Sequence, residues 1–220
     1  MSLEQELNQF KSQFLNQVDD ETQSIMAEAT AELSASDIEK LAVQVGSQLL
    51  EFTLPDQHGN QVTLSTLLQS GPLVVSFYRG GWCPYCNLEL GALQKVLPEI
   101  EELGAQLVAI TPELPDESMS TTEKNALQFK ILTDQGASYA RQLGLVFTLP
   151  EKLRPIYEAF GINIEKHNGS GQFDLPLAAT YVVGQDGKIV SAYIDADYTK
   201  RQEPQEILSA LKALQSEVVN

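Results

Sequence analysis

The two cysteines of this chain, Cys83 and Cys86, lie three positions apart, between a predicted strand and a predicted helix. The run LVVSFY at 73–78 is apolar, β-branched and aromatic, which is typical of a buried strand. A short loop at 79–81 carries two glycines and leads to the cysteines. Beyond them, one helical face collects apolar side chains: Cys86, Leu90, Leu93, Leu97 and Ile100. We therefore expect an α/β fold with the cysteine pair at the start of a helix, which Pro98 should kink or break.

This position favours redox chemistry at the pair. Free backbone N–H groups and the helix dipole stabilise a thiolate at a helix start, and Pro84 is tolerated there because it needs no N–H partner. The spacing places both sulfurs on one side of the first turn, so one thiolate can attack and the other can resolve the product as a disulfide. A zinc site needs four ligands, and the only histidines, His58 and His167, are distant and are read as surface residues. We expect neither a metal nor a cofactor.

Composition excludes several other functions. The 220 residues include 14 Lys+Arg and 30 Asp+Glu, a net charge of −16, which disfavours nucleic acid and anionic membranes as partners. No apolar run approaches the length of a membrane span, and the start MSLEQELNQF lacks the features of a signal peptide. Two cysteines cannot hold together a secreted, disulfide-stabilised scaffold of 220 residues. We therefore expect a cytoplasmic location.

Residues 1–46 are predicted to form an N-terminal helical arm. Leu3, Leu7, Phe10, Phe14 and Val18 recur at helical spacing and form one apolar stripe. This stripe has two interpretations: it packs on its own domain, or it forms a homodimer contact. A capping-box pattern at 36–39 predicts a further helix start.

Residues 47–220 alternate strand and helix patterns and are predicted to form one domain. Strands are expected near 52–54, 61–64, 107–110, 130–133, 179–183 and 188–194. Helices are expected near 117–128 and 137–143, and a last one from Pro204. The segment 145–176 interrupts this order and reads as an insertion over the core, with a short helix at 150–160 and a loop at 167–171. This order implies a mixed sheet covered by helices on both faces.

Several segments together resemble the peroxiredoxin family, the AhpC/TSA branch of the thioredoxin fold, and more closely its CxxC-containing peroxiredoxin-like group. They agree in order over about 47–215: LEFTLPD at 50–56, FYRGGWCPYC at 77–86, AITP at 109–112, LTD at 132–134 and ATYVV at 179–183. The resemblance implies a thioredoxin-like α/β fold with an N-terminal helical extension. It also implies antioxidant thiol-peroxidase activity on hydroperoxides, with thioredoxin, glutaredoxin or glutathione as reductant.

The family resemblance implies roles for individual residues. Cys86 aligns with the peroxidatic cysteine, and Cys83, at the family's threonine position, then becomes the resolving cysteine. Glu89 matches the acidic or amide position three residues later. Arg79 replaces the family's proline, where it is either a source of positive charge or a solvated loop residue. The family's later arginine is absent, because Ala178 occupies its expected position.

The same motif also resembles thioredoxin through Trp82-Cys83 and glutaredoxin through CPYC at 83–86. In those proteins the first cysteine is the nucleophile, which would make Cys83 the attacking residue. Trp82 then either packs on the loop or shields the thiolate, and Tyr85 is expected as a ring beside the sulfurs. Three hypotheses follow: a thiol peroxidase, a thiol–disulfide oxidoreductase, and a non-enzymatic redox-sensing module.

Overall fold

A mixed five-stranded sheet forms the centre of the protein. The computed structural model describes residues 1–218, with side chains through Ser216. The strand order is β5-β4-β3-β8-β9. These strands span Lys130–Thr133, Gln106–Thr111, Leu73–Phe77, Ala178–Val183 and Ile189–Asp195. The β3–β4 and β4–β5 pairs are parallel, whereas β3–β8 and β8–β9 are antiparallel. The predicted mixed sheet is confirmed.

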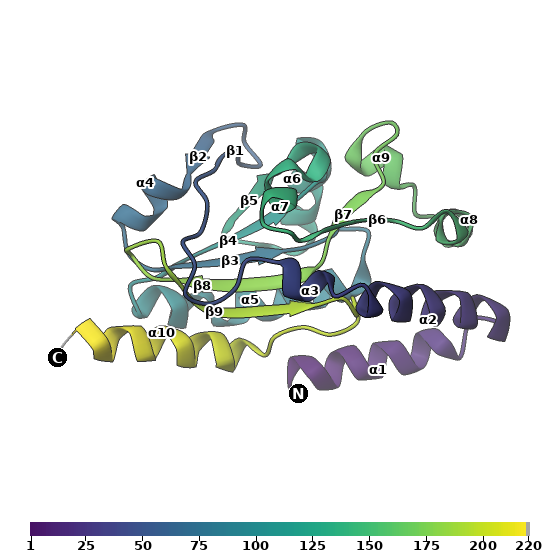
Figure 1. Cartoon of the computed structure of the whole chain (residues 1–220), viewed down its shortest axis with the longest axis horizontal. Coiled ribbons are helices and arrows are strands. Elements are labelled where there is room, and N and C mark those ends of the chain that lie inside the picture. Colours follow the sequence, from purple (N-terminus) through teal and green to yellow (C-terminus); the bar gives the residue numbers. More distant parts are fainter. Residues whose placement is uncertain (219–220) are drawn as a thin grey trace.

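Helices cover both faces of this sheet (Figure 1). On one face, α5 (Pro84–Glu102) and α10 (Pro204–Val218) share a buried apolar cluster with outward residues of β3 and β4. On the other face, α4 (Leu64–Gln69) and α7 (Ser138–Gln142) contribute to a second cluster around Phe77. All five residues of β3 are buried, because both faces of this central strand are covered.

The helix after the cysteines continues through Pro98, so the break allowed by the prediction does not occur. Helix α5 runs unbroken from Pro84 to Glu102. Pro98 is exposed and lies in the last part of the helix, where the buried residues Leu97 and Ile100 hold the helix against the sheet. This packing outweighs the hydrogen bond that the proline cannot make.

The N-terminal residues form three helices: α1 (Leu3–Leu15), α2 (Asp20–Ala35) and the single turn α3 (Ile38–Leu41). Leu3 and Leu7 are buried in the cluster formed by α5 and α10. The inward part of the stripe therefore packs on its own chain, and the homodimer contact stays a prediction. The capping box expected at 36–39 is wrong, because Asp37 adopts a left-handed conformation and caps α3 with no side-chain hydrogen bond.

The segment 145–176 forms a small substructure beside the sheet. Its two strands, β6 (Val146–Thr148) and β7 (Asp174–Pro176), pair antiparallel. Between them lie η2 (Glu151–Leu153), α8 (Arg154–Ala159) and α9 (Ile164–Asn168). The loop expected at 167–171 is therefore shorter than predicted. His167 belongs to α9 and is partly buried against Glu113 and Glu117, which corrects its assignment to the surface.

The remaining elements complete the domain. They are β1 (Thr53–Pro55), β2 (Gln61–Thr63), α6 (Pro115–Lys124) and η1 (Gln135–Ala137). Strands β1 and β2 pair antiparallel. No helix in residues 1–218 has the length and apolar character needed to cross a membrane.

Candidate active site

Cys83 and Cys86 lie at the first turn of α5, as predicted from the strand–loop–helix order. Cys83 is the N-cap residue and Pro84 occupies the first helical position. Both cysteines are reduced and fully buried. The preceding Gly80 and Gly81 allow this loop to pack closely, since a Cβ on Gly81 would lie 2.0 Å from Thr121 Oγ1. The loop therefore holds the pair against the protein interior.

Arg79 provides a buried positive charge next to the first sulfur. Its Nη2 donates to Cys83 Sγ at 3.3 Å, and its Nη1 donates to the Tyr157 hydroxyl at 3.0 Å. Its guanidinium also lies 4.2 Å from the centre of the Tyr198 ring and 5.0 Å from that of Trp82. Arg79 is only 4% exposed, so it is not a solvated loop residue. No carboxylate among the described residues forms an ion pair with it, and the Cys83 sulfur, as a thiolate, would supply the compensating negative charge.

A second arginine, Arg201, contacts the other sulfur. It lies in the loop between β9 and α10, and its Nη2 donates to Cys86 Sγ at 3.2 Å. Its Nε forms a short ion pair with the buried carboxylate of Glu89, which also accepts from Ser76 Oγ at 3.5 Å. Arg201 thus already has a carboxylate partner, in contrast to Arg79.

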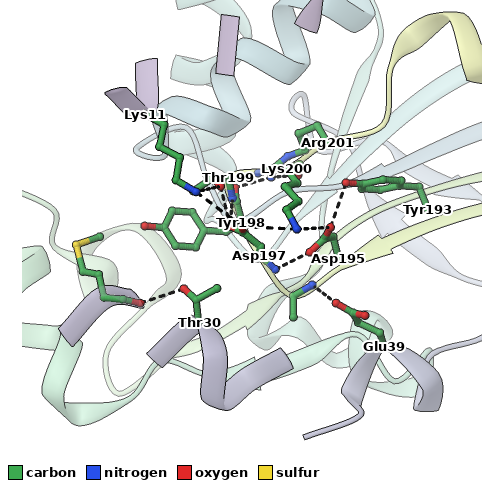
Figure 2. Close-up of polar contacts among 12 residues, drawn as sticks. Lys11, Thr30, Glu39, Tyr193, Asp195, Asp197, Tyr198, Thr199, Lys200 and Arg201 are labelled. Atoms are coloured by element: carbon green, nitrogen blue, oxygen red, sulfur yellow. Dashed lines mark hydrogen bonds and ion pairs between the residues drawn. The ribbon is translucent and has the colours of Figure 1, made fainter. Parts of the chain in front are cut away.

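The loop that carries Arg201 is fixed by polar contacts with the arm (Figure 2). Arg201 Nη1 donates to the carbonyl oxygens of Tyr198 and Lys200, both at 2.6 Å. In the same loop, Lys11 of α1 donates to Thr199 Oγ1 at 3.1 Å. The loop therefore connects the arm to both arginines, because the ring of Tyr198 lies over Arg79.

The two sulfurs differ in their protonation. Burial alone would raise the pKa of Cys83, but a hydrogen bond from the Cys86 thiol and the charges of Arg79 and Arg201 lower it well below its ordinary value. Burial, followed by the hydrogen bond and negative charge of Cys83, raises the pKa of Cys86. Burial also raises the pKa of Glu89, while Arg201 opposes that change. The surroundings of the pair thus favour the thiolate form at Cys83 over the thiolate form at Cys86.

The arm and the 145–176 segment cover the pair. The Phe10 ring of α1 contacts the Tyr85 ring edge-on at 5.1 Å between centroids. A cavity of about 190 Å³ remains between these elements. Its lining includes Arg79 and both chain neighbours of Cys83, Trp82 and Pro84. The cavity therefore reaches the residues on either side of Cys83, whose own side chain stays buried behind them.

The structure brings all the residues singled out in the sequence to one place. Arg79, Trp82, Cys83, Tyr85, Cys86 and Glu89 all lie at or beside the loop and the first turns of α5. Tyr85 contacts Phe10 and Tyr198, and burial, with the nearby Cys83 charge, raises its pKa to about 12. This hydroxyl stays protonated at neutral pH. Ala178 begins β8, so no arginine occupies the family's expected position.

Arg201 is the residue that sequence reasoning missed. Its position, 115 residues after Cys86, bears no motif, and the run DYTKRQE around it resembles an ordinary polar loop. Its charge and its place just before the helix start at Pro204 were the only signals. Among the described residues, no group of three or more His, Cys, Asp or Glu side chains could hold a metal ion.

Comparison with known proteins agrees with the fold. The model of the AhpC/TSA family matches residues 45–192, about two thirds of the chain. The chain belongs to the AhpC/TSA family. The thioredoxin-like α/β fold expected from the resemblance is confirmed. The crystal structure of peroxidoxin BcpB from Mycobacterium tuberculosis has a TM-score of 0.62, with 23% identity over 78% of this chain and 98% of that one.

Two relatives are also peroxiredoxins by name. Peroxiredoxin Bcp of Escherichia coli K12 is 26% identical over 153 residues, which are 70% of this chain and 86% of that protein. Chloroplastic peroxiredoxin Q of Gentiana triflora is 28% identical over 174 residues, 79% of this chain and 68% of that protein. This AhpC/TSA protein is thus an oxidoreductase of the thiol-peroxidase class, and peroxiredoxins act on hydroperoxides with thioredoxin-type reductants.

Proposed function

We propose that this protein reduces hydroperoxides with the Cys83–Cys86 pair and that Cys83 is the attacking thiolate. The observation that carries this order is the contact between Arg79 and Cys83. A fully buried guanidinium with no carboxylate partner among the described residues needs an anion beside it, and Cys83 Sγ is in that position. Arg201, at Cys86, is instead paired with Glu89. The resemblance to thioredoxin also makes Cys83 the attacking cysteine, whereas the resemblance to peroxiredoxins assigns that role to Cys86.

The reaction proceeds in two steps. The Cys83 thiolate attacks the outer oxygen of the hydroperoxide, the O–O bond breaks, and an alcohol or water leaves after taking up a proton. Cys83 becomes a sulfenic acid. Cys86 then forms the disulfide with Cys83 and water leaves. Two thiol equivalents from thioredoxin, glutaredoxin or glutathione restore the dithiol.

Burial of the sulfurs favours peroxide over protein disulfides as the oxidising substrate. Both cysteines have no exposed surface, and the cavity beside them, about 190 Å³ and lined by both chain neighbours of Cys83, has room for a small molecule only. A thiol–disulfide oxidoreductase must instead present its nucleophile to another protein. Cytoplasmic location belongs to the same proposal, because a reducing compartment keeps the pair available as a dithiol.

Separate Cys83→Ser and Cys86→Ser variants test the order. After one addition of hydrogen peroxide, Cys86→Ser should accumulate a sulfenic acid that a 1,3-diketone traps, and Cys83→Ser should not. Sulfenic acid on Cys86 in the Cys83→Ser variant, with none on Cys83 in the other, would reverse the order. Reduction of insulin disulfides by a wild-type protein that leaves peroxide untouched would replace the peroxidase by a thiol–disulfide oxidoreductase.

A further inference from the structure

Each sulfur of the pair has its own guanidinium, and the two guanidinium groups have different surroundings. Arg79 contacts Cys83 and is held by aromatic rings and the Tyr157 hydroxyl. Arg201 contacts Cys86 and is held by Glu89 and two backbone carbonyls. The proposed peroxide step uses the contact of Arg79 with Cys83 and does not use the contact of Arg201 with Cys86.

We propose that Arg201 acts in the later steps of the cycle by stabilising the Cys86 thiolate. This thiolate attacks the Cys83 sulfenic acid during condensation, and it is the leaving group when the disulfide is reduced. This inference rests on the proposed function, in which Cys83 attacks first. Arg201 Nη2 lies 3.2 Å from Cys86 Sγ, within charge-assisted hydrogen-bonding distance of the reacting atom.

The chemical state of Cys83 determines when this contact matters. Burial raises the pKa of the Cys86 thiol most, and in the resting dithiol the hydrogen bond with Cys83 and its negative charge raise this pKa further. The two contributions from Cys83 disappear when it becomes a neutral sulfenic acid, while burial remains. Arg201, fixed by Glu89 and by the carbonyls of Tyr198 and Lys200, stays beside Cys86. The oxidation of Cys83 therefore promotes loss of the proton from Cys86.

Both later steps balance with a Cys86 thiolate. In the condensation, the Cys86 sulfur attacks the Cys83 sulfur, so the S–S bond forms and the S–O bond of the sulfenic acid breaks. The hydroxide that is released takes up the proton lost by Cys86 and leaves as water. In the reduction, a thiolate of the reductant attacks the Cys83 sulfur and the S–S electron pair passes to Cys86. A second thiol then releases the reductant as its disulfide and restores Cys83.

The groups that face Cys86 allow a clean set of variants. Removing Arg201 alone would leave the Glu89 carboxylate buried without a partner, which threatens folding. The double variant Arg201→Met/Glu89→Gln removes both charges together, and Arg201→Lys keeps the positive charge. Arg141→Gln is the matched control, because Arg141 pairs with Asp174 at the surface and contacts neither sulfur.

The test is a single turnover of the pre-reduced full-length protein with hydrogen peroxide, followed by Trp82 fluorescence and by quenching with a 1,3-diketone for mass spectrometry. Loss of the charge of Arg201 should raise the pKa of the Cys86 thiol by about one pH unit or more, which lowers the fraction of thiolate. Disulfide formation in the double variant should therefore slow by about tenfold more than sulfenic acid formation. The sulfenic form of Cys83 should accumulate. Arg201→Lys should give an intermediate effect, and Arg141→Gln should match wild type.

The outcomes separate this inference from the proposed function. Equal slowing of both steps, or an unchanged condensation step, would overturn the role of Arg201 while leaving the peroxidase intact. Selective slowing of the first step would assign Arg201 to the attacking thiolate and overturn the inference. Absence of any sulfenic acid in wild type and Cys86→Ser would overturn the proposed function itself.

Discussion

The guanidinium of Arg79 lies 3.3 Å from the sulfur of Cys83, and the described residues offer it no carboxylate. The two groups depend on each other, because each would be a buried, unpaired charge without its partner. This relationship distinguishes the two cysteines more clearly than their order in the motif does. A substitution of Arg79 tests this relationship directly.

Replacing Arg79 should raise the pKa of Cys83. In Arg79→Gln the opposite charge is lost, so the midpoint of the pH profile for alkylation by iodoacetamide should move upward by about one to three units. Arg79→Lys should move it less. An unchanged midpoint in Arg79→Gln would show that the thiolate does not depend on this contact.

The same pair makes the stability of the reduced protein depend on pH. Because the pKa of Cys83 is lowered on folding, the thiolate contributes fully to the free energy of unfolding above the pKa of the unfolded thiol. This contribution is lost as the pH falls through the lowered value. Urea denaturation of reduced wild type at several pH values should show the loss, and Cys83→Ser should lack it.

Tyr157 and Tyr198 offer a matched comparison around Arg79. Both rings lie over the guanidinium, but only the Tyr157 hydroxyl accepts a hydrogen bond from it. Tyr157→Phe should slow peroxide attack by about two- to tenfold, since Arg79 loses one fixed partner. Tyr198→Phe keeps its ring and should stay close to wild type. Equal rates in the two variants would show that the Tyr157 hydrogen bond does not position Arg79.

Helix α1 should contribute measurably to the stability of the domain. Leu7 is 3% exposed in the cluster with α5, whereas Leu15 on the same helix is 38% exposed. Leu7→Ala should lower the free energy of unfolding by about 2–4 kcal/mol. Leu15→Ala should change it by no more than about 0.5 kcal/mol. If both variants denature at the same urea concentration as wild type, α1 is not part of the folded core.

Pro98 should be a site where substitution stabilises the protein. In Pro98→Ala the new N–H can donate to the carbonyl of Gln94, so the free energy of unfolding should rise by about 1–2 kcal/mol. Pro84→Ala is the control: at the first helical position the added N–H has no partner within the helix, so no gain is expected. A loss of stability in Pro98→Ala would show that the helix is adapted to the proline.

Local sequence patterns were sufficient to predict the position of the cysteine pair. A buried strand, a glycine loop and an apolar helical face are short-range signals, and they correctly predicted β3, α5 and the place of Cys83 at the helix start. They did not show that the helix continues through Pro98, and at 36–39 they predicted a helix start correctly but its capping box wrongly. At Pro98, tertiary packing against the sheet outweighs helix propensity. At 36–39, the chain turns through a left-handed Asp37.

The sequence by itself determined the fold family, the redox character of the CxxC pair and its near neighbours along the chain, from Arg79 to Glu89. Only the tertiary structure decided that Arg79 is buried against Cys83, that Arg201 reaches Cys86 from 115 residues away, and that α1 covers both. The reason is physical. Helix starts and buried strands depend on neighbouring residues, whereas the partner of a buried charge depends on where distant loops meet, and no periodic pattern in the sequence records that meeting.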